Sequence, residues 1–196
     1  MTREKEIRQL FSSFEVRTNE ETNEELLEGY ALKFESWSEN FGDWREIISS
    51  TALEKTNLSD VRALINHDSN YILARNTAGN LSLEVDSIGL RFKMKPAKTT
   101  YYRDLLENIK AGNINQCSFG FWLRWDNSNC EEWSYNEDLK LYERRINDIE
   151  TITEISILST PAYKSTEVVM ARGLNEYKSE LQRQLNKRKL AIELEL

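Results

Sequence analysis

Residues 70–97 carry three short strand-like segments separated by turns, and their close spacing is the strongest constraint on how this chain folds. In NYILARNTAGNLSLEVDSIGLRFKMKPA the breaks fall at Ala78-Gly79-Asn80 and at Ser87-Ile88-Gly89. Connections this short cannot contain the crossover that parallel neighbours need. The segment therefore predicts consecutive antiparallel strands.

Alternation of apolar and polar residues recurs on both sides of this segment. A hairpin is expected from SSFEVR at 12–17 and LLEGYALKFE at 26–35, which flank the polar turn TNEETNEE. VRALINH predicts a strand that ends at His67, and three or four more strands follow between Ile114 and Pro161. The pattern predicts a β-rich α+β protein, either a small antiparallel sheet or a compact antiparallel β-barrel, of about eight strands.

Two helices complete the expected architecture. Residues 99–111 place apolar side chains at helical spacing, with Thr99 or Thr100 as the N-cap and Gly112 at the end. Residues 174–196 predict an amphipathic helical tail with a charged outer face. The apolar stripe of this tail consists of Leu174, Tyr177, Leu181 and Leu185.

Composition excludes several kinds of protein. A net charge of −7 argues against nucleic acid as the main partner, because phosphate binding needs a basic surface. One histidine and two cysteines, Cys117 and Cys130, match no metal motif, and nothing suggests a cofactor. The start MTREKEIRQLF has no apolar signal core, and no stretch is long enough to span a membrane. We expect a reducing cytoplasm with both thiols reduced.

The segment NINQCSFGFWLRW at 113–125 raises the possibility of a nucleophile, Ser118. A serine hydroxyl needs a base within hydrogen-bond reach, and the one histidine of the chain, His67, is the one candidate. The alternatives are a small strand residue at 118 and a histidine bonded to backbone at 67. Cys117 is a competing nucleophile, but it shares a strand face with Phe119 and Phe121, which predicts a packed core thiol.

Carboxylates that could orient the histidine cluster downstream. Candidates for this third position are Asp148, Glu150 and Glu154, with Asp68 a further one. In IETITEISIL, Glu154 shares a strand face with Ile152 and Ser156. A carboxylate buried in such a strand needs a partner, whereas on an edge strand it would face water.

Three segments, INHD, NINQCSFGFW and ITEISILSTPAYKST, resemble the signature segments of the prohead proteases of HK97-like tailed bacteriophages. These enzymes are related to the herpesvirus assemblins, and the resemblance extends from Gly29 to Thr166. It implies a compact β-barrel flanked by helices, with Ser118 as nucleophile and His67 as catalytic histidine. Glu154 falls on the third catalytic position, where assemblins have a second histidine, and Asp148 or Glu150 are the alternatives.

The resemblance implies a serine endopeptidase that acts in the host cytoplasm, inside the phage prohead. Its substrates would be the major capsid protein and the scaffold, and finally the enzyme itself, without a cofactor, nucleic acid or membrane; a homo-oligomer is possible. Residues 1–166 would form the protease domain and 167–196 a C-terminal helical extension. Two rivals remain open: an inactive protease-like β-barrel that serves as a scaffolding or binding module, and a cysteine peptidase that uses Cys117.

The oxyanion hole departs from the related enzymes. Assemblins have arginines shortly after the third catalytic residue, but the matching stretch STPAYKST contains none. Backbone amides between Thr160 and Tyr163 are the expected donors, except Pro161, which has no N–H.

Overall fold

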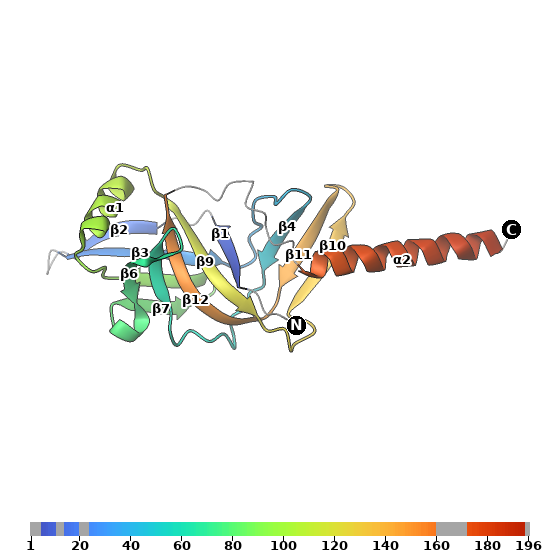
Figure 1. Cartoon of the computed structure of the whole chain (residues 1–196), viewed down its shortest axis with the longest axis horizontal. Coiled ribbons are helices and arrows are strands. Elements are labelled where there is room, and N and C mark those ends of the chain that lie inside the picture. The colour runs from blue at the N-terminus through green and yellow to red at the C-terminus, as the bar shows by residue number, and fades with distance from the viewer. Residues whose placement is uncertain (1–4, 11–13, 20–23, 160–171, 195–196) are drawn as a thin grey trace.

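The computed structural model describes residues 5–10, 14–19, 24–159 and 172–194, and these form strands with two α-helices (Figure 1). The strands before the first helix are β1 (Glu6–Leu10), β2 (Phe14–Asn19), β3 (Glu24–Lys33), β4 (Trp44–Ile48), β5 (Arg62–Ile65), β6 (Asp68–Arg75), β7 (Leu81–Val85) and β8 (Gly89–Met94). After α1 (Thr100–Lys110) come β9 (Gln116–Leu123), β10 (Glu131–Asn136), β11 (Leu141–Ile146), β12 (Ile149–Leu158) and the helix α2 (Arg172–Leu194). A 3₁₀ turn, η1 (Asn76–Ala78), connects β6 to β7.

The described strands form three sheets. The five-stranded sheet has the order β1-β9-β12-β5-β6, the four-stranded sheet β2-β3-β8-β7, and the three-stranded sheet β10-β11-β4. The expected hairpin is present as β2 and β3, and β7 and β8 are antiparallel neighbours. The β-rich architecture with two helices is therefore confirmed.

The expected closed antiparallel barrel is not what the described strands form. β12 runs parallel to β5, and β11 runs parallel to β4, so two of the three sheets are mixed. Both parallel pairs join strands far apart in the sequence, and alternation within a strand carries no information about such partners. Local spacing predicted the β2–β3 and β7–β8 hairpins and missed these two pairings. It was wrong for β6 and β7, which follow each other in residues 70–97 but lie in different sheets.

The main core lies between the five-stranded and four-stranded sheets, and α1 closes one end of it. Cys117, Phe119 and Phe121 are all fully buried in this core, as the alternation in β9 predicted. The rings of Phe119 and Phe121 stack with their centroids 5.2 Å apart. The opposite face of β9 therefore carries the other set of residues, Gln116, Ser118, Gly120 and Trp122.

Helix α1 confirms the predicted helix at 99–111 almost residue for residue. Thr99 is extended, and its hydroxyl accepts a hydrogen bond from the Tyr102 amide at 3.2 Å. Leu105 and Leu106 are buried on the core side. Gly112 follows the helix with a φ of 77°, a left-handed conformation that glycine adopts without a steric penalty.

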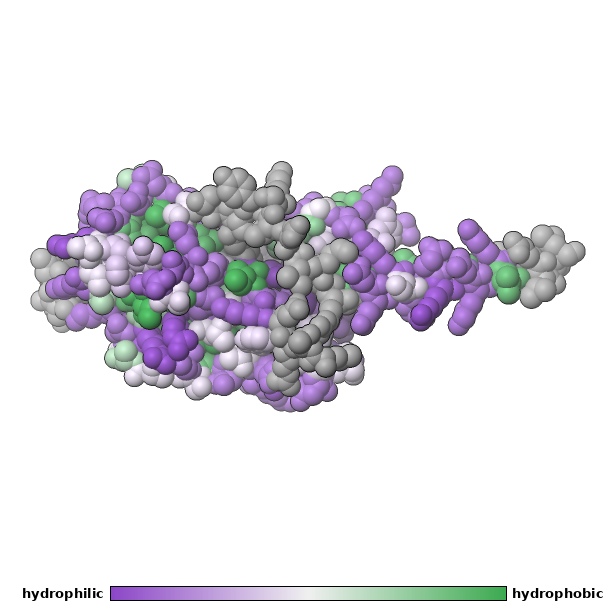
Figure 2. Space-filling model, in the orientation of Figure 1, coloured by the Kyte–Doolittle hydropathy of each residue, from purple (hydrophilic) through white to green (hydrophobic). Residues whose placement is uncertain are grey.

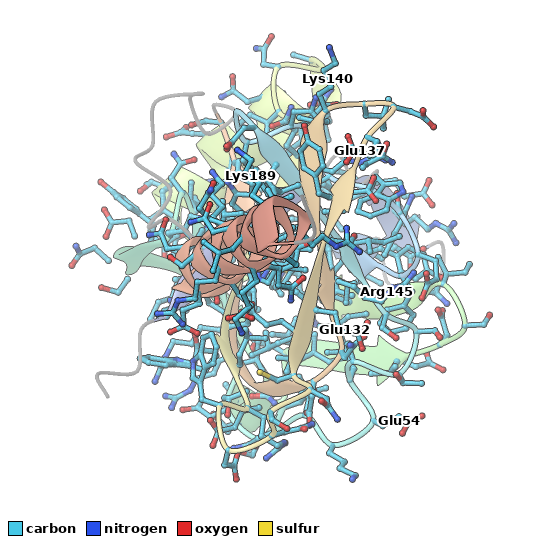
Figure 3. The ribbon with its side chains drawn as sticks, turned by 90° about the vertical axis from the view of Figure 1, so that its right-hand side faces the viewer. Glu54, Glu132, Glu137, Lys140, Arg145 and Lys189 are labelled. Atoms are coloured by element: carbon cyan, nitrogen blue, oxygen red, sulfur yellow. The ribbon has the colours of Figure 1, made fainter. Side chains whose placement is uncertain are left out.

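Helix α2 leaves the β body beside β10 and β11 and extends well beyond it (Figure 1). Leu174 at its start is fully buried against Trp44, whereas Leu185 and Leu190 are exposed. The projecting part is largely hydrophilic in Figure 2, and Figure 3, which looks along the helix, shows Lys189 on its outside. No helix among the described residues is long and apolar enough to cross a membrane. The predicted domain boundary at residues 166 and 167 falls outside the described residues and stays a prediction.

Candidate active site

Ser118 lies near the start of β9, the second strand of the five-stranded sheet. Its backbone is opposite Gln9 of β1 on one side and Ser156 of β12 on the other. Because directly opposed residues in a sheet point to the same face, the side chains of Ser118 and Ser156 share the face turned away from Phe119. The Ser118 side chain is fully buried.

His67 lies in a tight turn, whereas the sequence had predicted that it ends a strand. β5 ends at Ile65, which is paired with Asp68 of β6, so Asn66 and His67 form a two-residue hairpin loop. Both have left-handed backbones, with φ of 51° and 61°, as a type I′ turn requires. The turn is fixed to β12, because the His67 amide donates to the Ser156 hydroxyl at 3.2 Å and the Ser159 amide donates to the Asn66 side chain at 2.9 Å.

Glu154 contacts the imidazole directly. Its Oε1 lies 3.1 Å from Nδ1 of His67, and the Lys5 ammonium donates to the same oxygen. Burial alone would raise the pKa of the Glu154 carboxyl, but the hydrogen bonds from His67 and Lys5 and the Lys5 charge outweigh it and hold that pKa below its ordinary value. Glu154 is therefore a buried carboxylate with partners, as opposed to an exposed edge residue.

This contact determines which imidazole nitrogen can act as a base. A carboxylate at Nδ1 favours the tautomer with its proton on Nδ1, which leaves the lone pair on Nε2. Nε2 is buried and has no hydrogen-bond partner among the described residues. An unpartnered buried acceptor is costly in a folded protein and is typical of a position that a substrate or nucleophile completes.

Gly120 provides the space in which this arrangement fits. It is opposite Glu154 in the pairing of β9 with β12. A Cβ atom at this position would lie 2.8 Å from Oε1 of Glu154 and would collide with the side chain of Lys5. The small residue next to Ser118 on this face thus allows the carboxylate to reach His67.

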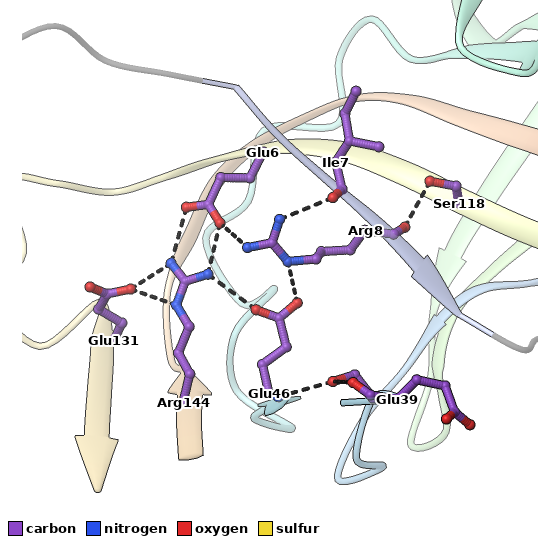
Figure 4. Close-up of polar contacts among 9 residues, drawn as sticks. Glu6, Ile7, Arg8, Glu39, Glu46, Ser118, Glu131 and Arg144 are labelled. Atoms are coloured by element: carbon purple, nitrogen blue, oxygen red, sulfur yellow. Dashed lines mark hydrogen bonds and ion pairs between the residues drawn. The ribbon is translucent and has the colours of Figure 1, made fainter. Parts of the chain in front are cut away.

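The Ser118 hydroxyl is not bonded to the imidazole in this structure. It donates instead to the backbone carbonyl of Arg8 in β1, at 2.8 Å (Figure 4). The structure thus brings His67 and Glu154 into contact and places Ser118 opposite Ser156, the residue to which the His67 amide is bonded.

The alternative site residues lie in other environments. Asp148 accepts hydrogen bonds from Arg124 at 3.1 Å and Asn127 at 2.8 Å, and Asp68 accepts from Asn70. Cys117 is in the core on the other face of β9. Cys130 is buried, and this burial raises the pKa of its thiol to about 11.

Two further expectations concern the oxyanion hole and metal binding. The expected oxyanion donors between Thr160 and Tyr163 lie outside the described residues. Within the described ranges, no group of three or more histidine, cysteine, aspartate and glutamate side chains is arranged to hold a metal ion.

A buried ionic cluster beside the site was not predicted from the sequence. Arg144 of β11 is fully buried and bonds to Glu6 of β1, Glu46 of β4 and Glu131 of β10, while Arg8 pairs with Glu6 and Glu46 (Figure 4). These five side chains are the β1 anchor. EIRQL lacks the period-2 alternation of a half-buried strand, and nothing in the sequence identifies the partners of β1.

Comparison with protein-family models identifies one family. A family model described as caudovirus prohead serine protease matches residues 12–180. Among solved structures, the chain is similar to the bacteriophage T4 capsid assembly protease, gp21, with a TM-score of 0.45 and 12% sequence identity over 78% of this chain and 98% of that chain. No protein with a curated description matches the sequence.

Proposed function

Because the chain belongs to the caudovirus prohead serine protease family, we propose that it cleaves the major capsid protein and scaffold inside the prohead, and finally itself. Membership of this family makes it a serine protease of capsid maturation, and its substrates and catalytic residues are our proposal. In this proposal Ser118 is the nucleophile, His67 the general base and Glu154 the residue that orients the imidazole. The observation that carries these assignments is the Glu154–His67 contact at 3.1 Å, with Nε2 left without a partner among the described residues.

The chemistry follows from these positions. Ser118 attacks the peptide carbonyl while Nε2 of His67 takes the hydroxyl proton, and the Glu154 carboxylate stabilises the imidazolium that forms. His67 then protonates the leaving amine, and an acyl-enzyme remains on Ser118. Water, deprotonated by the same nitrogen, hydrolyses the ester and restores the serine. General base catalysis of this kind contributes about 10²- to 10⁴-fold to the rate.

Co-expression with the phage's own capsid protein tests the assignment. Wild type should shorten the capsid protein, and mass spectrometry of the new ends locates the cuts. Ser118→Ala and His67→Ala should both abolish cleavage, because members of such a triad act as a unit. Ser134→Ala, an exposed serine in β10, is the matched control and should cleave normally.

The same assay separates the two rivals. A cysteine peptidase predicts that Cys117→Ala is inactive and that Ser118→Ala retains activity. An inactive scaffolding module predicts no cleavage by wild type and no covalent labelling by a fluorophosphonate. Cleavage by folded Ser118→Ala would contradict the proposed nucleophile.

A further inference from the structure

Strand β1 covers the proposed nucleophile. Its residues pair with β9 from Glu6 opposite Phe121 to Leu10 opposite Cys117, and β1 is the edge strand of its sheet. The backbone carbonyl of Arg8 accepts a hydrogen bond from the Ser118 hydroxyl. Because this hydroxyl donates to a carbonyl and the serine is fully buried, Ser118 is neither accessible to a substrate nor bonded to its base.

An extended substrate could use the same edge. If β1 leaves, β9 exposes a row of unpaired backbone groups directly beside Ser118, and an incoming peptide strand can replace the lost hydrogen bonds. The family match begins at residue 12 and leaves β1 outside it. β1 and a substrate segment would therefore compete for one edge.

The β1 anchor indicates which kind of side chain a substrate segment would carry if it replaced β1. The Arg8 guanidinium is buried beside Glu46 and lies 5.7 Å from the ring centroids of Trp44 and Phe121. The β1 anchor has three carboxylates and two guanidinium groups, an excess of one negative charge. Loss of β1 removes Glu6 and Arg8 together, so this excess stays with Glu46, Glu131 and Arg144, and Glu46 loses its Arg8 partner. An aromatic pocket with excess negative charge favours a basic side chain.

We propose that β1 is an occluding strand: it occupies the edge of β9 on which substrate pairs, and an incoming segment displaces it and places a basic side chain in the Arg8 pocket. This inference rests on the proposed function, because it takes Ser118 as the nucleophile. Activity then depends on the fraction of molecules in which β1 has left.

A single substitution can lock β1 in place. Leu10 is opposite the native thiol of Cys117. Opposed Cα atoms in an antiparallel pair lie about 4.5–5.5 Å apart, within the ~4.4–6.8 Å that a disulfide spans. Leu10→Cys in the full chain should therefore form a reversible bridge between β1 and β9. Leu10→Cys combined with Cys117→Ser is the matched control, which cannot form it.

The readout is the rate at which a fluorophosphonate labels Ser118. Oxidised Leu10→Cys should label at least about 10-fold more slowly than the reduced form, since label enters only when β1 is away. The control should label equally with and without oxidant. Equal labelling of oxidised and reduced Leu10→Cys, with the bridge verified by mass spectrometry, would overturn the inference and leave the proposed function intact. No labelling of reduced protein and no capsid-protein cleavage would overturn both.

A second variant tests the pocket without a disulfide. Arg8→Ala removes the β1 side chain that pairs with Glu46 and should speed labelling. The peptide KEIRQLF, which repeats residues 5–11, should then slow labelling of this variant by at least about 10-fold at a concentration where the same peptide with Arg8→Glu has no effect. Equal effects of the two peptides would contradict the basic pocket.

Discussion

Glu154 interacts with two donors on the same oxygen, the imidazole of His67 and the ammonium of Lys5. Lys5 directly precedes β1, so displacement of β1 would remove the ammonium from the carboxylate. Glu154 would then act on His67 alone. The same event that uncovers Ser118 would thus strengthen the interaction that supports the imidazolium.

Glu154→Gln tests the role of the carboxylate with little change in shape. A glutamine can still accept from Nδ1, but it carries no charge to stabilise the imidazolium. We expect kcat to fall on the order of 10³- to 10⁴-fold with KM nearly unchanged. Kinetics on a peptide substrate mapped from the capsid protein would measure this. Glu150→Gln, on the same strand, is the control, and loss of activity in that variant alone would reassign the third position.

The lowered pKa of Glu154 also predicts a dependence of stability on pH. Because the folded-state pKa lies below the unfolded one, the unfolded chain binds more protons in this range. The stabilisation is complete above the ordinary glutamate pKa and is lost as pH falls through the folded value. Urea unfolding from about pH 6 to pH 3 should show a shallower loss in Glu154→Gln than in wild type. Glu137→Gln, exposed in the turn after β10, should keep the wild-type slope.

Gly120→Ala tests the space beside the carboxylate. The added methyl group would push against Oε1 of Glu154 and the Lys5 side chain. Lys5 is flexible and can move, but Glu154 is held in a strand, so its contact with His67 should lengthen. Misplacement of about 1 Å can cost on the order of 10²-fold in rate, and we expect kcat to fall by about that amount. Wild-type kcat in a folded variant would show that the carboxylate tolerates the methyl group.

At the scale of elements, the β1 anchor joins two sheets. β1 belongs by its backbone to the five-stranded sheet, whereas Glu6 binds Arg144 of β11 and Arg8 binds Glu46 of β4. Burial of Arg144 is compensated by three carboxylates. Breaking such a cluster at one member leaves buried charge without a partner.

Arg144→Met should therefore destabilise the protein by about 3–5 kcal/mol. Its neighbour Arg145 provides the matched control, because alternation along β11 puts it on the opposite face and it forms a more exposed ion pair with Glu35. Arg145→Met should cost no more than about 1 kcal/mol. Urea unfolding followed by tryptophan fluorescence would compare the two. Equal effects would mean that the cluster contributes nothing beyond a surface pair.

Local patterns predicted the elements that depend on their own residues. Alternation in β9 and β12 placed Ser118 and Glu154 on defined strand faces, and Thr99 and Gly112 marked the ends of α1. That His67 would meet Glu154 followed from the resemblance to a family, because no local pattern links residues 87 positions apart. Lys5 and Arg144 were missed for the same reason: their partners are set by tertiary packing.

At the scale of the whole molecule, α2 is held to the body by its first turns. Leu174 packs on Trp44, Lys178 pairs with Asp43 at 2.7 Å, and Tyr177 contacts the ring of Tyr142. The sequence predicted this helix and its apolar stripe. It could not predict that the later part of the stripe would remain exposed, because periodicity identifies a face without naming what covers it.

Leu174→Ala should release α2 from the body. Truncation of this fully buried side chain should weaken the packing of α2 on the body by about 2–5 kcal/mol and leave the stability of the sheets unchanged. We expect faster hydrogen exchange throughout α2 and little change in β9 and β12. Leu190→Ala, at an exposed position of the same helix, should leave exchange unchanged. Similar exchange in the two variants would show that α2 is not fastened through Leu174.

Strand β1 pairs with β9 through its backbone and contacts the three-stranded sheet through Glu6 and Arg8, so the burial of Ser118 is coupled to that sheet. Trp44, on which Leu174 packs, lies on β4, the same strand as Glu46, which forms an ion pair with Arg8. A conformational change in β4 therefore changes the free energy difference between covered and uncovered Ser118. By reciprocity, displacement of β1 changes the free energy of that change in β4 by the same amount. A force on α2 and the binding of a peptide at the edge of β9 would then act on the same equilibrium, the displacement of β1.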